Sequence, residues 1–373
     1  MKILYISKSI IPSRSANSIH VMKMCQAFAN NGHKVVLLAP DIKNQYEKNV
    51  NNIYNYYAVK NNFHIIKLLH PNFKGGAFIY VISIFFYLLF NRGFDLIYGR
   101  FLHGIYAATF LSHKVIYETH LPVSNKKNHR LIIFKRLIKS KYLIKMVVIS
   151  KALKKIYLEK GFLNESKIQV AHDGADSVEN LNNKIELLGE KKNLKVGYVG
   201  HLYKGRGIQT IIDCAKNLND MTFHLVGGLS KDIEYWKSYI KKLNIENVFF
   251  YGFVSPIETI KYRNSFDIFL APYEKKVSIF GSNESDTSKF MSPLKIFEYM
   301  SHKKPIIASD LPVIREVLNE SNSLLVECDN IELWINSLKK LRVSKNRELI
   351  ANKALIDFRN YIWNNRAILV IKY

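Results

Sequence analysis

Two cations, Arg206 and Lys295, are the residues of this chain best placed to do chemistry, since each lies where a helix is expected to begin. The segment VGYVGHLYKGRGIQTIIDCA (196–215) ends a strand at Gly200 and continues into a glycine-rich loop that carries Arg206. Glycines let backbone N–H groups approach an anion closely, and a helix start adds free donors and a positive dipole. Arg206 could bind a diphosphate through two parallel hydrogen bonds. The alternative interpretation is an ordinary strand-turn-helix unit, in which the glycines serve only the geometry of the turn.

A second segment, MSPLKIFEYMSHKKPIIASDLPVIREVL (291–318), predicts a helix that starts near Pro293, because proline is favoured in a first helical turn. Lys295 falls in that turn, where a cation is unfavourable unless an anion lies beside it. Glu298 follows three residues later on nearly the same face and could hold a diol such as ribose. The structural alternative is a solvated Lys–Glu pair.

Two further loops follow predicted strands. VIYETH (115–120) delivers Glu118 and His120 to the carboxyl end of a buried strand. A single histidine is more often structural than catalytic, but one at a strand's carboxyl end is a better candidate. The loop 7–18 precedes a helix that Ser15, Asn17 or Ser18 could cap, leaving backbone donors for an anion.

Several common chemistries are excluded by missing motifs. The chain has no G-x-x-x-x-G-K-[ST], no G-x-G-x-x-G after a strand, no H-E-x-x-H and no G-x-S-x-G. It also has no D-x-D, so no carboxylate pair for a catalytic divalent metal is evident. The three cysteines are far apart, which argues against a disulfide scaffold or a zinc site and fits a reducing compartment.

Short apolar runs alternate with helical stretches along most of the 373 residues, a pattern typical of parallel sheets covered on both faces. Residues 181–193 are polar and lack a clear period, which predicts a linker. We therefore expect a first α/β domain over 1–180 and a second over 194–358, with ligands at the carboxyl ends of the strands. The predicted strands are 2–7, 34–40, 63–68, 95–100, 114–118, 145–150, 194–200, 221–228, 247–253, 266–272, 304–309 and 323–327.

The net charge of +25 is unevenly distributed, with +17 in residues 1–180 and eleven Lys or Arg but no acid in 121–158. A field of this sign attracts polyanions such as nucleic acid, an anionic membrane or phosphorylated substrates. The uncharged run Ala77–Phe90 is shorter than the ~20 residues that span a bilayer. The segment Asn128–Lys141 predicts a basic amphipathic helix, with Lys135, Arg136 and Lys139 opposite its apolar arc. Such a helix could lie on an anionic membrane surface. Alternatively, its apolar side could face the protein core and its basic side the solvent.

Taken together, these segments resemble the family-four retaining glycosyltransferases of the "glycosyl transferases group 1" type. The resemblance spans both halves and implies the GT-B fold: α/β, with two doubly wound Rossmann-like domains facing a central cleft. Residues 359–373 resemble the terminal helix by which such enzymes cross back to the N-terminal domain. The segments that carry the resemblance are SANSIHVMKMCQAFANNGHKV, IYETH, VVISKALKKIYLEKG with AHDGAD, VGYVGHLYKGRG, HLVGG, FDIFLAPY and SPLKIFEYMSHKKPIIASDLPVIREVL.

The resemblance implies transfer of a sugar from a nucleotide-diphosphate-sugar of UDP or GDP type, with retention and without a metal or other cofactor. The acceptor would be a saccharide or a lipid-linked or surface-polysaccharide precursor, at the inner face of a bacterial cytoplasmic membrane. His120, Arg206 and Lys295 match the catalytic positions. The matching donor-binding positions are Ala16, Asn17, Gly200, Arg206, Gly227, Val254, Pro293, Leu294, Lys295 and Glu298.

Two positions depart from the family pattern. Phe290 stands where a first glutamate is common, so Glu284 or Asp286 could supply the acid, and His201 stands where an arginine is frequent. Two other functions remain open: a sugar-nucleotide epimerase on the same fold, and a basic nucleic-acid-binding protein. Against the second, the chain has no RNP-like, helix-turn-helix or zinc signature, so no nucleic-acid partner is expected.

Overall fold

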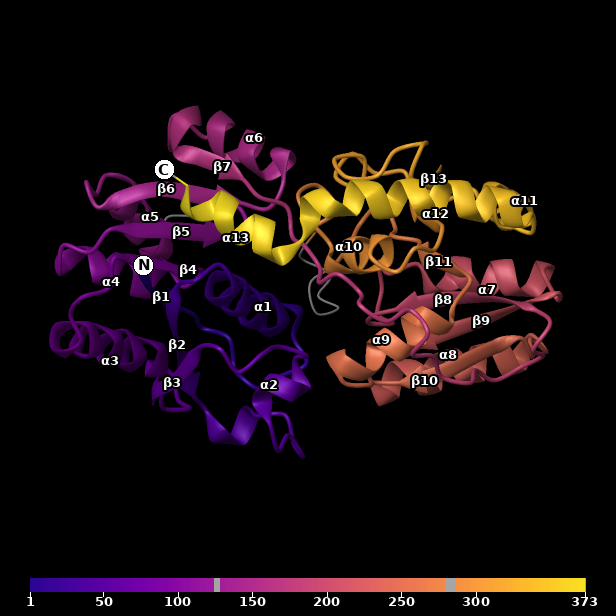
Figure 1. The fold of residues 1–373 in the computed structure, drawn as a ribbon, viewed down its shortest axis with the longest axis horizontal. Coiled ribbons are helices and arrows are strands. Elements are labelled where there is room, and N and C mark those ends of the chain that lie inside the picture. The colour runs from indigo at the N-terminus through magenta and orange to yellow at the C-terminus, as the bar shows by residue number, and fades with distance from the viewer. Residues whose placement is uncertain (124–127, 279–285, 373) are drawn as a thin grey trace. The chain divides into compact units, whose positions relative to one another are not determined.

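The computed structural model describes residues 1–123, 128–278 and 286–372, which form two compact units (Figure 1). Unit 1 consists of Met1–Asp173 and Trp363–Tyr373, and unit 2 of Gly174–Ile362. Each unit is built on one parallel sheet with helices packed against it. The two doubly wound sheets confirm the predicted α/β fold class.

The sheet of unit 1 has seven parallel strands in the order β3-β2-β1-β4-β5-β6-β7. The chain reverses its direction of winding between β1 and β4, which makes the carboxyl ends of these strands the expected ligand side. Buried Ile, Leu, Val and Tyr side chains dominate its central strands. The strands are β1 (Lys2–Ile6), β2 (Lys34–Asp41), β3 (His64–Leu69), β4 (Leu96–Gly99), β5 (Val115–Thr119), β6 (Leu143–Val148) and β7 (Ile168–Val170).

The helices of unit 1 form two groups of neighbours. Helix α1 packs beside α13, whereas α3 packs beside α4 and α4 beside α5. Both α1 and α5 begin with a side-chain cap, from Ser15 and Asn128 respectively. The helices are α1 (Ala16–Asn30), α2 (Ile53–Tyr56), α3 (Gly76–Phe90), α4 (Leu102–Phe110), α5 (His129–Ile138), α6 (Lys151–Glu159) and α13 (Trp363–Ile371), with 3-10 turns η1 (Lys43–Gln45) and η2 (Glu165–Lys167).

Unit 2 repeats this plan with six parallel strands in the order β10-β9-β8-β11-β12-β13. Its winding reverses between β8 and β11, and its core includes the fully buried Trp334 and Phe223. The strands are β8 (Leu194–Val199), β9 (Met221–Val226), β10 (Val248–Gly252), β11 (Ile268–Ala271), β12 (Ile306–Ser309) and β13 (Leu324–Val326). The helices are α7 (Ile208–Asn217), α8 (Ser230–Lys242), α9 (Pro256–Ser265), α10 (Leu294–Met300), α11 (Ile331–Lys340) and α12 (Ser344–Phe358), with the 3-10 turn η3 (Arg359–Tyr361).

The segment between the two sheets, where a linker was predicted over 181–193, packs on unit 2. The backbone N–H of Ile185 donates to Ser265 Oγ at 2.8 Å, and Asn264 Nδ2 donates to the carbonyl of Asn183 at 2.9 Å. Leu187 is buried. The structure thus divides the chain at residue 173 rather than at 180.

Two other elements differ in extent from the sequence prediction. The three-residue strand β7 was not predicted, because Ile168–Val170 is too short to stand out as an apolar run. The final helix begins at Trp363 rather than 359, after the turn η3. No helix in the described ranges is long and apolar enough to cross a membrane.

Candidate functional site

Two glycines bring together the loops that follow β8 and β9. Gly227 has a φ of +113°, and a Cβ built there would lie 2.3 Å from the carbonyl oxygen of Gly200. The N–H of Gly200 donates to the carbonyl of Val226 at 2.9 Å, and the N–H of Gly227 donates to that of Gly252 at 2.7 Å. The close approach of backbone to backbone therefore requires glycine, and it places two predicted donor-binding residues side by side at the carboxyl edge of the sheet.

Arg206 extends from the loop between Gly200 and α7. The loop is fixed by Gly207, whose φ is +71° and where a Cβ would lie 1.6 Å from the carbonyl oxygen of Pro272. Arg206 Nη2 donates to the hydroxyl of Tyr203 at 2.9 Å, and its guanidinium carbon lies 5.0 Å from that ring's centre. Arg206 Nε is buried without a partner among the described residues. One donor of the guanidinium is therefore left for a ligand.

Lys295 reaches the same place from the first turn of α10. Its Nζ lies 3.8 Å from the ring centre of Tyr198 and 5.1 Å from that of Tyr273. A Cβ at Gly200 would lie 2.9 Å from this Nζ, so the ammonium sits directly over the glycine.

Arg206 and Lys295 share one aromatic surface, because the guanidinium carbon of Arg206 also lies 5.7 Å from the ring centre of Tyr273. Neither cation has a carboxylate within ion-pair distance in the described part of the chain. Burial, together with the charge of Arg206, holds the pKa of Lys295 well below its usual range. An anion bound here would relieve both the burial of charge and the repulsion between the cations.

Helix α10 is held firmly against the sheet that carries these loops. The hydroxyl of Tyr299 accepts a hydrogen bond from the N–H of Val199 at 2.8 Å, and its ring stacks on Phe269 with centres 4.1 Å apart. Pro293 caps the helix and Leu294 is its first residue. The predicted helix start is thus confirmed, and the position of Lys295 follows from it.

Glu298 lies one turn further along α10 and is positioned by a residue that the sequence did not point to. Its Oε2 lies 3.4 Å from Nη1 of Arg263, a buried side chain of α9 whose Nε donates to His302 Nε2 at 3.3 Å. No described residue bonds Oε1 of Glu298, which leaves that oxygen for a ligand hydroxyl. The alternative of a Lys295–Glu298 pair is not formed among the described residues.

Of the two positions suggested as a substitute acid, the structure describes Asp286, whose carboxylate bonds within its own loop. Asp286 Oδ1 accepts from the N–H of Val277 at 3.1 Å and from Ser288 N–H and Oγ at 2.9 and 2.7 Å. Burial raises the pKa of Asp286, but these hydrogen bonds outweigh it and hold that pKa below its usual value. The carboxylate therefore shapes its own loop. Glu284 lies outside the described residues, and Val254 lies in the connection between β10 and α9.

In unit 1, His120 belongs to a polar cluster centred on Glu118 near the end of β5. His120 Nε2 lies 2.5 Å from Oε1 of the fully buried Glu118. Arg366 of α13 donates to both Glu118 oxygens, from Nη2 at 2.9 Å and from Nη1 at 3.3 Å, and the hydroxyl of Tyr98 also donates to this carboxylate. His120 is therefore oriented by a carboxylate that the last helix of the chain neutralises.

His20 of α1 and Asp173 complete this cluster. His20 Nε2 lies 3.1 Å from Glu118 Oε1 and 3.3 Å from Asp173 Oδ1, and its ring packs edge-on against His120 and Trp363. Burial lowers the pKa of His20 to about 4 and that of His120 well below its usual range. Burial also raises the pKa of Asp173 to about 7. At neutral pH both imidazoles are uncharged, so His120 is available to exchange hydrogen bonds with a ligand.

The same cluster has the donor set of a metal site, since His20, Glu118, His120 and Asp173 each bring one ligand atom within 4.8 Å of the others. The guanidinium of Arg366 already bonds both oxygens of Glu118. A divalent cation would have to displace this buried cation or lie against it. The residues present thus fit an internal ion pair better than a metal.

Ala16 and Asn17 lie exposed in the first turn of α1, which follows the loop after β1. The cap is Ser15, whose Oγ accepts from the N–H of Ser18 at 3.1 Å. In unit 2 the structure brings together Gly200, Gly227, Arg206 and Lys295, with Glu298 one helical turn away. Ala16, Asn17 and His120 belong to unit 1.

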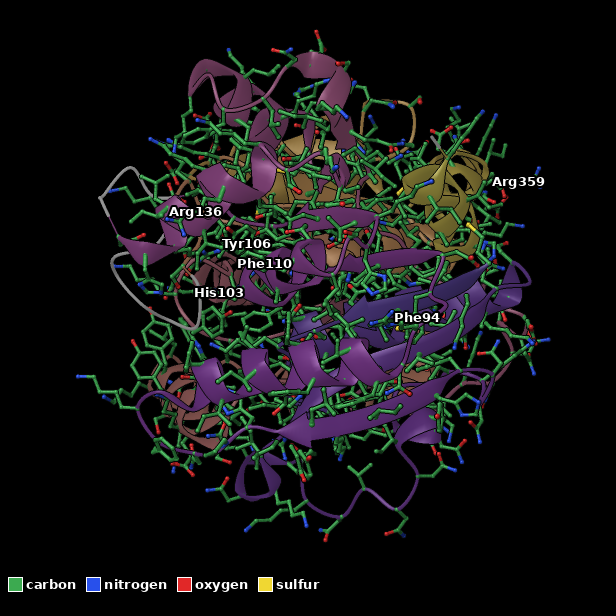
Figure 2. The ribbon with its side chains drawn as sticks, turned by 90° about the vertical axis from the view of Figure 1, so that its left-hand side faces the viewer. Phe94, His103, Tyr106, Phe110, Arg136 and Arg359 are labelled. Carbon is green, nitrogen blue, oxygen red and sulfur yellow. The ribbon has the colours of Figure 1, made fainter. Side chains whose placement is uncertain are left out.

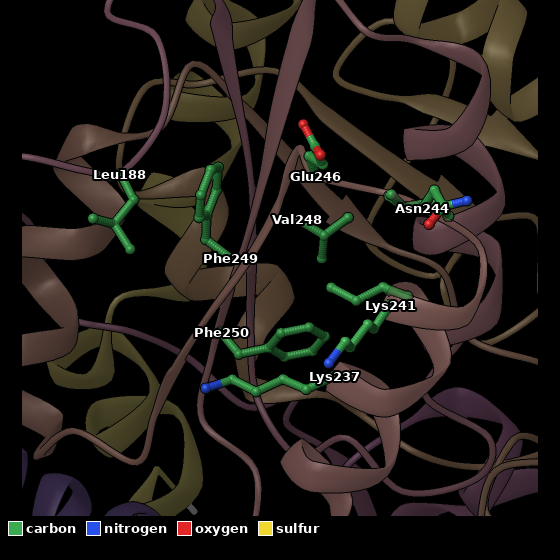
Figure 3. A pocket seen from close by; sticks show the side chains of 10 residues that line it. Leu188, Lys237, Lys241, Asn244, Glu246, Val248, Phe249 and Phe250 are labelled. Atoms are coloured by element: carbon green, nitrogen blue, oxygen red, sulfur yellow. The ribbon is translucent and has the colours of Figure 1, made fainter.

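A hollow of about 400 Å³ in unit 2 contains none of the predicted site residues (Figure 3). Lys237 and Lys241 reach it from α8, and Asn244, Glu246 and Phe249 line it around the start of β10. It therefore lies at the amino end of an edge strand, whereas ligands of such sheets bind at the carboxyl ends.

Comparisons with known proteins agree with this arrangement in both units. Residues 18–179 match the family described as glycosyltransferase family 4, and residues 193–342 match the one described as glycosyl transferases group 1. The solved structure of Anabaena Alr3699/HepE in complex with UDP has a TM-score of 0.72 at 17% identity, covering 99% of this chain and 98% of that one. At that identity it shows the fold alone, and it confirms the GT-B class.

Two curated relatives are similar in sequence. An uncharacterized glycosyltransferase, MJ1069 of Methanocaldococcus jannaschii, is 25% identical over 279 residues, which are 71% of this chain and 65% of the relative. The putative teichuronic acid biosynthesis glycosyltransferase TuaH of Bacillus subtilis is 23% identical over 187 residues, 50% of this chain and 44% of the relative. The chain thus spans less than two thirds of the length of either relative. With both of its units matched by the two family models, the chain belongs to glycosyltransferase family 4, of the glycosyl transferases group 1 type.

Proposed function

We propose that this protein transfers a sugar from a nucleotide-diphosphate-sugar to a hydroxyl acceptor, with retention of anomeric configuration and without a metal. The observation that supports this most is the pair Arg206 and Lys295, which meet over Tyr273 with no carboxylate within ion-pair distance among the described residues. A diphosphate has the charge and the shape to lie between them.

Departure of the nucleoside diphosphate places negative charge on its phosphates and oxocarbenium character on the sugar. Donors fixed before the reaction stabilise such developing charge without reorganisation. Arg206 Nε, Lys295 Nζ and the N–H groups of the α7 and α10 starts would take this role. In this proposal the chain's own cations stabilise the leaving group, and the donor phosphate serves as base for the acceptor hydroxyl.

His120 would contact the donor sugar from unit 1. Because its Nε2 is held by Glu118, the ring is fixed in orientation, and its lowered pKa keeps it neutral. A neutral, oriented imidazole can hydrogen-bond a sugar hydroxyl without opposing the positive charge that develops at the anomeric carbon. His120 would therefore act mainly in the transition state.

The relatives suggest the kinds of substrate. Alr3699/HepE was solved with UDP and with UDP-glucose, and the name of TuaH refers to teichuronic acid biosynthesis. We propose a UDP-hexose as the first donor to test and a surface-polysaccharide precursor as acceptor, with a GDP-sugar as the alternative donor.

Turnover tests this function directly. The protein is incubated with UDP-glucose, UDP-galactose, UDP-N-acetylglucosamine or GDP-mannose and a panel of saccharide acceptors, with and without EDTA. We expect acceptor-dependent release of nucleoside diphosphate, unchanged by EDTA, and a product with the anomeric configuration of the donor by NMR. Release that ceases with EDTA would contradict metal independence. An inverted product would contradict retention, and epimerised donor with no transfer would replace the proposed function.

The exposed Lys204 provides a matched control from the same loop as Arg206. Lys204→Ala removes a cation from the loop surface and should retain turnover, whereas Arg206→Ala should lower it by at least about 100-fold, as loss of one donor to a developing anion does elsewhere. Equal losses in the two variants would mean that the loop contributes only general positive charge.

A further inference from the structure

The outer side of α3 exposes a row of large apolar side chains. Phe78, Ile82, Phe86 and Phe90 are 68%, 38%, 50% and 79% exposed. They are spaced four residues apart, so they follow one side of the helix. The helix carries no charged residue along its 15 residues. We call this row the α3 stripe.

The α3 stripe cannot pack against the core of unit 1, because the opposite side of the helix already does so. Tyr80, Ile84 and Leu88 are buried there, and the hydroxyl of Tyr80 donates to the carbonyl of Ser7 at 2.7 Å. Both sides of α3 are therefore apolar, and only one of them is covered by the residues of unit 1 that the structure describes.

Neighbouring elements also expose large apolar side chains. Leu69 at the end of β3 and Phe73 just before α3 are 63% and 62% exposed. Phe110 at the end of α4 is 65% exposed and Ile132 of α5 is 53% exposed. Helix α4 packs beside both α3 and α5, and Figure 2, which views this side of unit 1, shows Phe110 on α4 and Arg136 on α5.

The segment that contains α3, α4 and α5 is strongly basic in sequence. Residues 61–158 contain sixteen Lys or Arg and two acids, Asp95 and Glu118. Glu118 is fully buried against Arg366, and Asp95 accepts a hydrogen bond from the N–H of Lys2. The exposed cations of α5 and its C-cap are Arg130, Lys135, Arg136 and Lys139, which form no ion pair with any described residue.

We propose that unit 1 docks on an anionic lipid bilayer through the α3 stripe and the basic side of α5. Phenyl rings would enter the boundary between headgroups and acyl chains, while the cations of α5 contact lipid phosphates. Helix α3 is about 22 Å long, so it would lie along the surface. A surface that binds a soluble polyanion needs only cations. The exposed phenylalanines of this surface therefore favour a lipid bilayer over a soluble polyanion.

A second copy of the chain is the other occupant to consider. Charge argues against it, because a symmetric pairing of the α3 stripes would bring two basic α5 surfaces toward each other. An anionic bilayer satisfies both the apolar and the charged part of the surface at once. Docking does not depend on the proposed function, but if both hold, the acceptor would be membrane-borne.

Vesicle sedimentation tests the docking without any sugar nucleotide. We expect the wild type to sediment with phosphatidylglycerol vesicles at low salt, to be released by salt, and to remain in solution with phosphatidylcholine vesicles. Replacing Lys135, Arg136 and Lys139 by Gln should weaken binding on the order of 100-fold, at roughly fivefold per cation. Phe78→Gln with Phe86→Gln should weaken it at least about tenfold.

Matched controls come from unit 2. Lys339, Lys340 and Lys345 are exposed, and their replacement by Gln removes the same charge. Leu349→Gln with Ile356→Gln removes exposed apolar side chains of 72% and 54% exposure. Both controls should bind vesicles like the wild type, and circular dichroism should show all variants folded.

Three results would overturn the proposal: no binding of the wild type to anionic vesicles, undiminished binding of the α3-stripe variant, or losses in the controls as large as in the test variants. A concentration-dependent dimer that the α3-stripe variant abolishes would assign the surface to a second copy instead. None of these outcomes affects turnover with a soluble acceptor, so they are distinguishable from failure of the proposed function.

Discussion

Replacing Arg366 by Met should destabilise unit 1 more than any surface substitution, because it leaves the carboxylate of Glu118 buried without its cation. Glu118 and Arg366 have side chains that are 0% and 3% exposed, and the closest N–O distance between them is 2.9 Å. Removing one partner of such a buried pair costs about 3–5 kcal/mol. At roughly 2–4 °C per kcal/mol, the unfolding midpoint should fall by about 6–20 °C.

The pH dependence of this loss has a defined sign. In the wild type, burial opposes ionisation of Glu118, but Arg366 and the neighbouring histidines hold the pKa of its carboxyl well below the usual value. That stabilises the folded state above the unfolded pKa of about 4.5 and is lost as pH falls through the folded pKa. In Arg366→Met, burial without the cation raises the pKa of Glu118, so the variant loses stability as pH rises above 4.5. The difference in stability between wild type and variant should therefore be largest near pH 7, shrink as pH falls to 4.5 and shrink further below it.

The assay is thermal or urea unfolding followed by circular dichroism, with Arg315→Met as the matched control. Arg315 pairs with Asp310 and Glu320 at the surface and is 43% exposed, so its loss should cost less than about 1 kcal/mol. Adding Glu118→Gln to Arg366→Met should recover much of the stability, because the unpaired charge is gone. An effect of Arg366→Met no larger than the control, or no recovery in the double variant, would refute this explanation.

Three other predictions concern single residues. Binding of UDP at alkaline pH should take up a proton, because the diphosphate raises the depressed pKa of Lys295. Calorimetry in buffers of different ionisation enthalpy should show this uptake in the wild type and not in Lys295→Met, and equal uptake in both would contradict it. Gly207→Ala should fail to fold or lose more than about 3 kcal/mol, since its φ is +71° and a Cβ would lie 1.6 Å from the Pro272 carbonyl, whereas Gly161→Ala, with φ +63° and open space, should cost only about 1 kcal/mol in urea unfolding. The raised pKa of Asp173, about 7, stabilises the fold below pH 4 and is lost as pH rises to 7, so Asp173→Asn should flatten the stability profile between pH 4 and 7; an unchanged slope would show that another group titrates.

The parts of the candidate site that depend on residues close together in the sequence could be predicted from the sequence alone. Gly200, Arg206 and Lys295 could be placed because a strand, a glycine loop and a helix start each leave a signature within a few residues. The helix start at Pro293 was predicted for the same reason.

The parts of the site that the sequence did not predict depend on contacts between segments that are far apart in the chain. Arg366 meets Glu118 across 248 residues of sequence, and Arg263 meets Glu298 from a different helix. Tyr273, which lies under both cations, follows a strand that was predicted, but nothing local marks its ring as their common support. The one available signal for Arg366 was its place directly before the apolar run AILVI of the final helix, since a buried guanidinium requires a carboxylate partner.

The central claim, a diphosphate site at Arg206 and Lys295, is tested most directly by calorimetric binding of UDP, GDP and their nucleosides to the wild type, Arg206→Ala and Lys204→Ala. We expect the wild type to bind one diphosphate more tightly than its nucleoside. Arg206→Ala should weaken the diphosphate by about 10–150-fold, corresponding to 1.5–3 kcal/mol for a charge-assisted contact, and leave the nucleoside unchanged. Lys204→Ala should match the wild type. Equal weakening of diphosphate and nucleoside by Arg206→Ala, or no binding of either diphosphate to the wild type, would contradict the account.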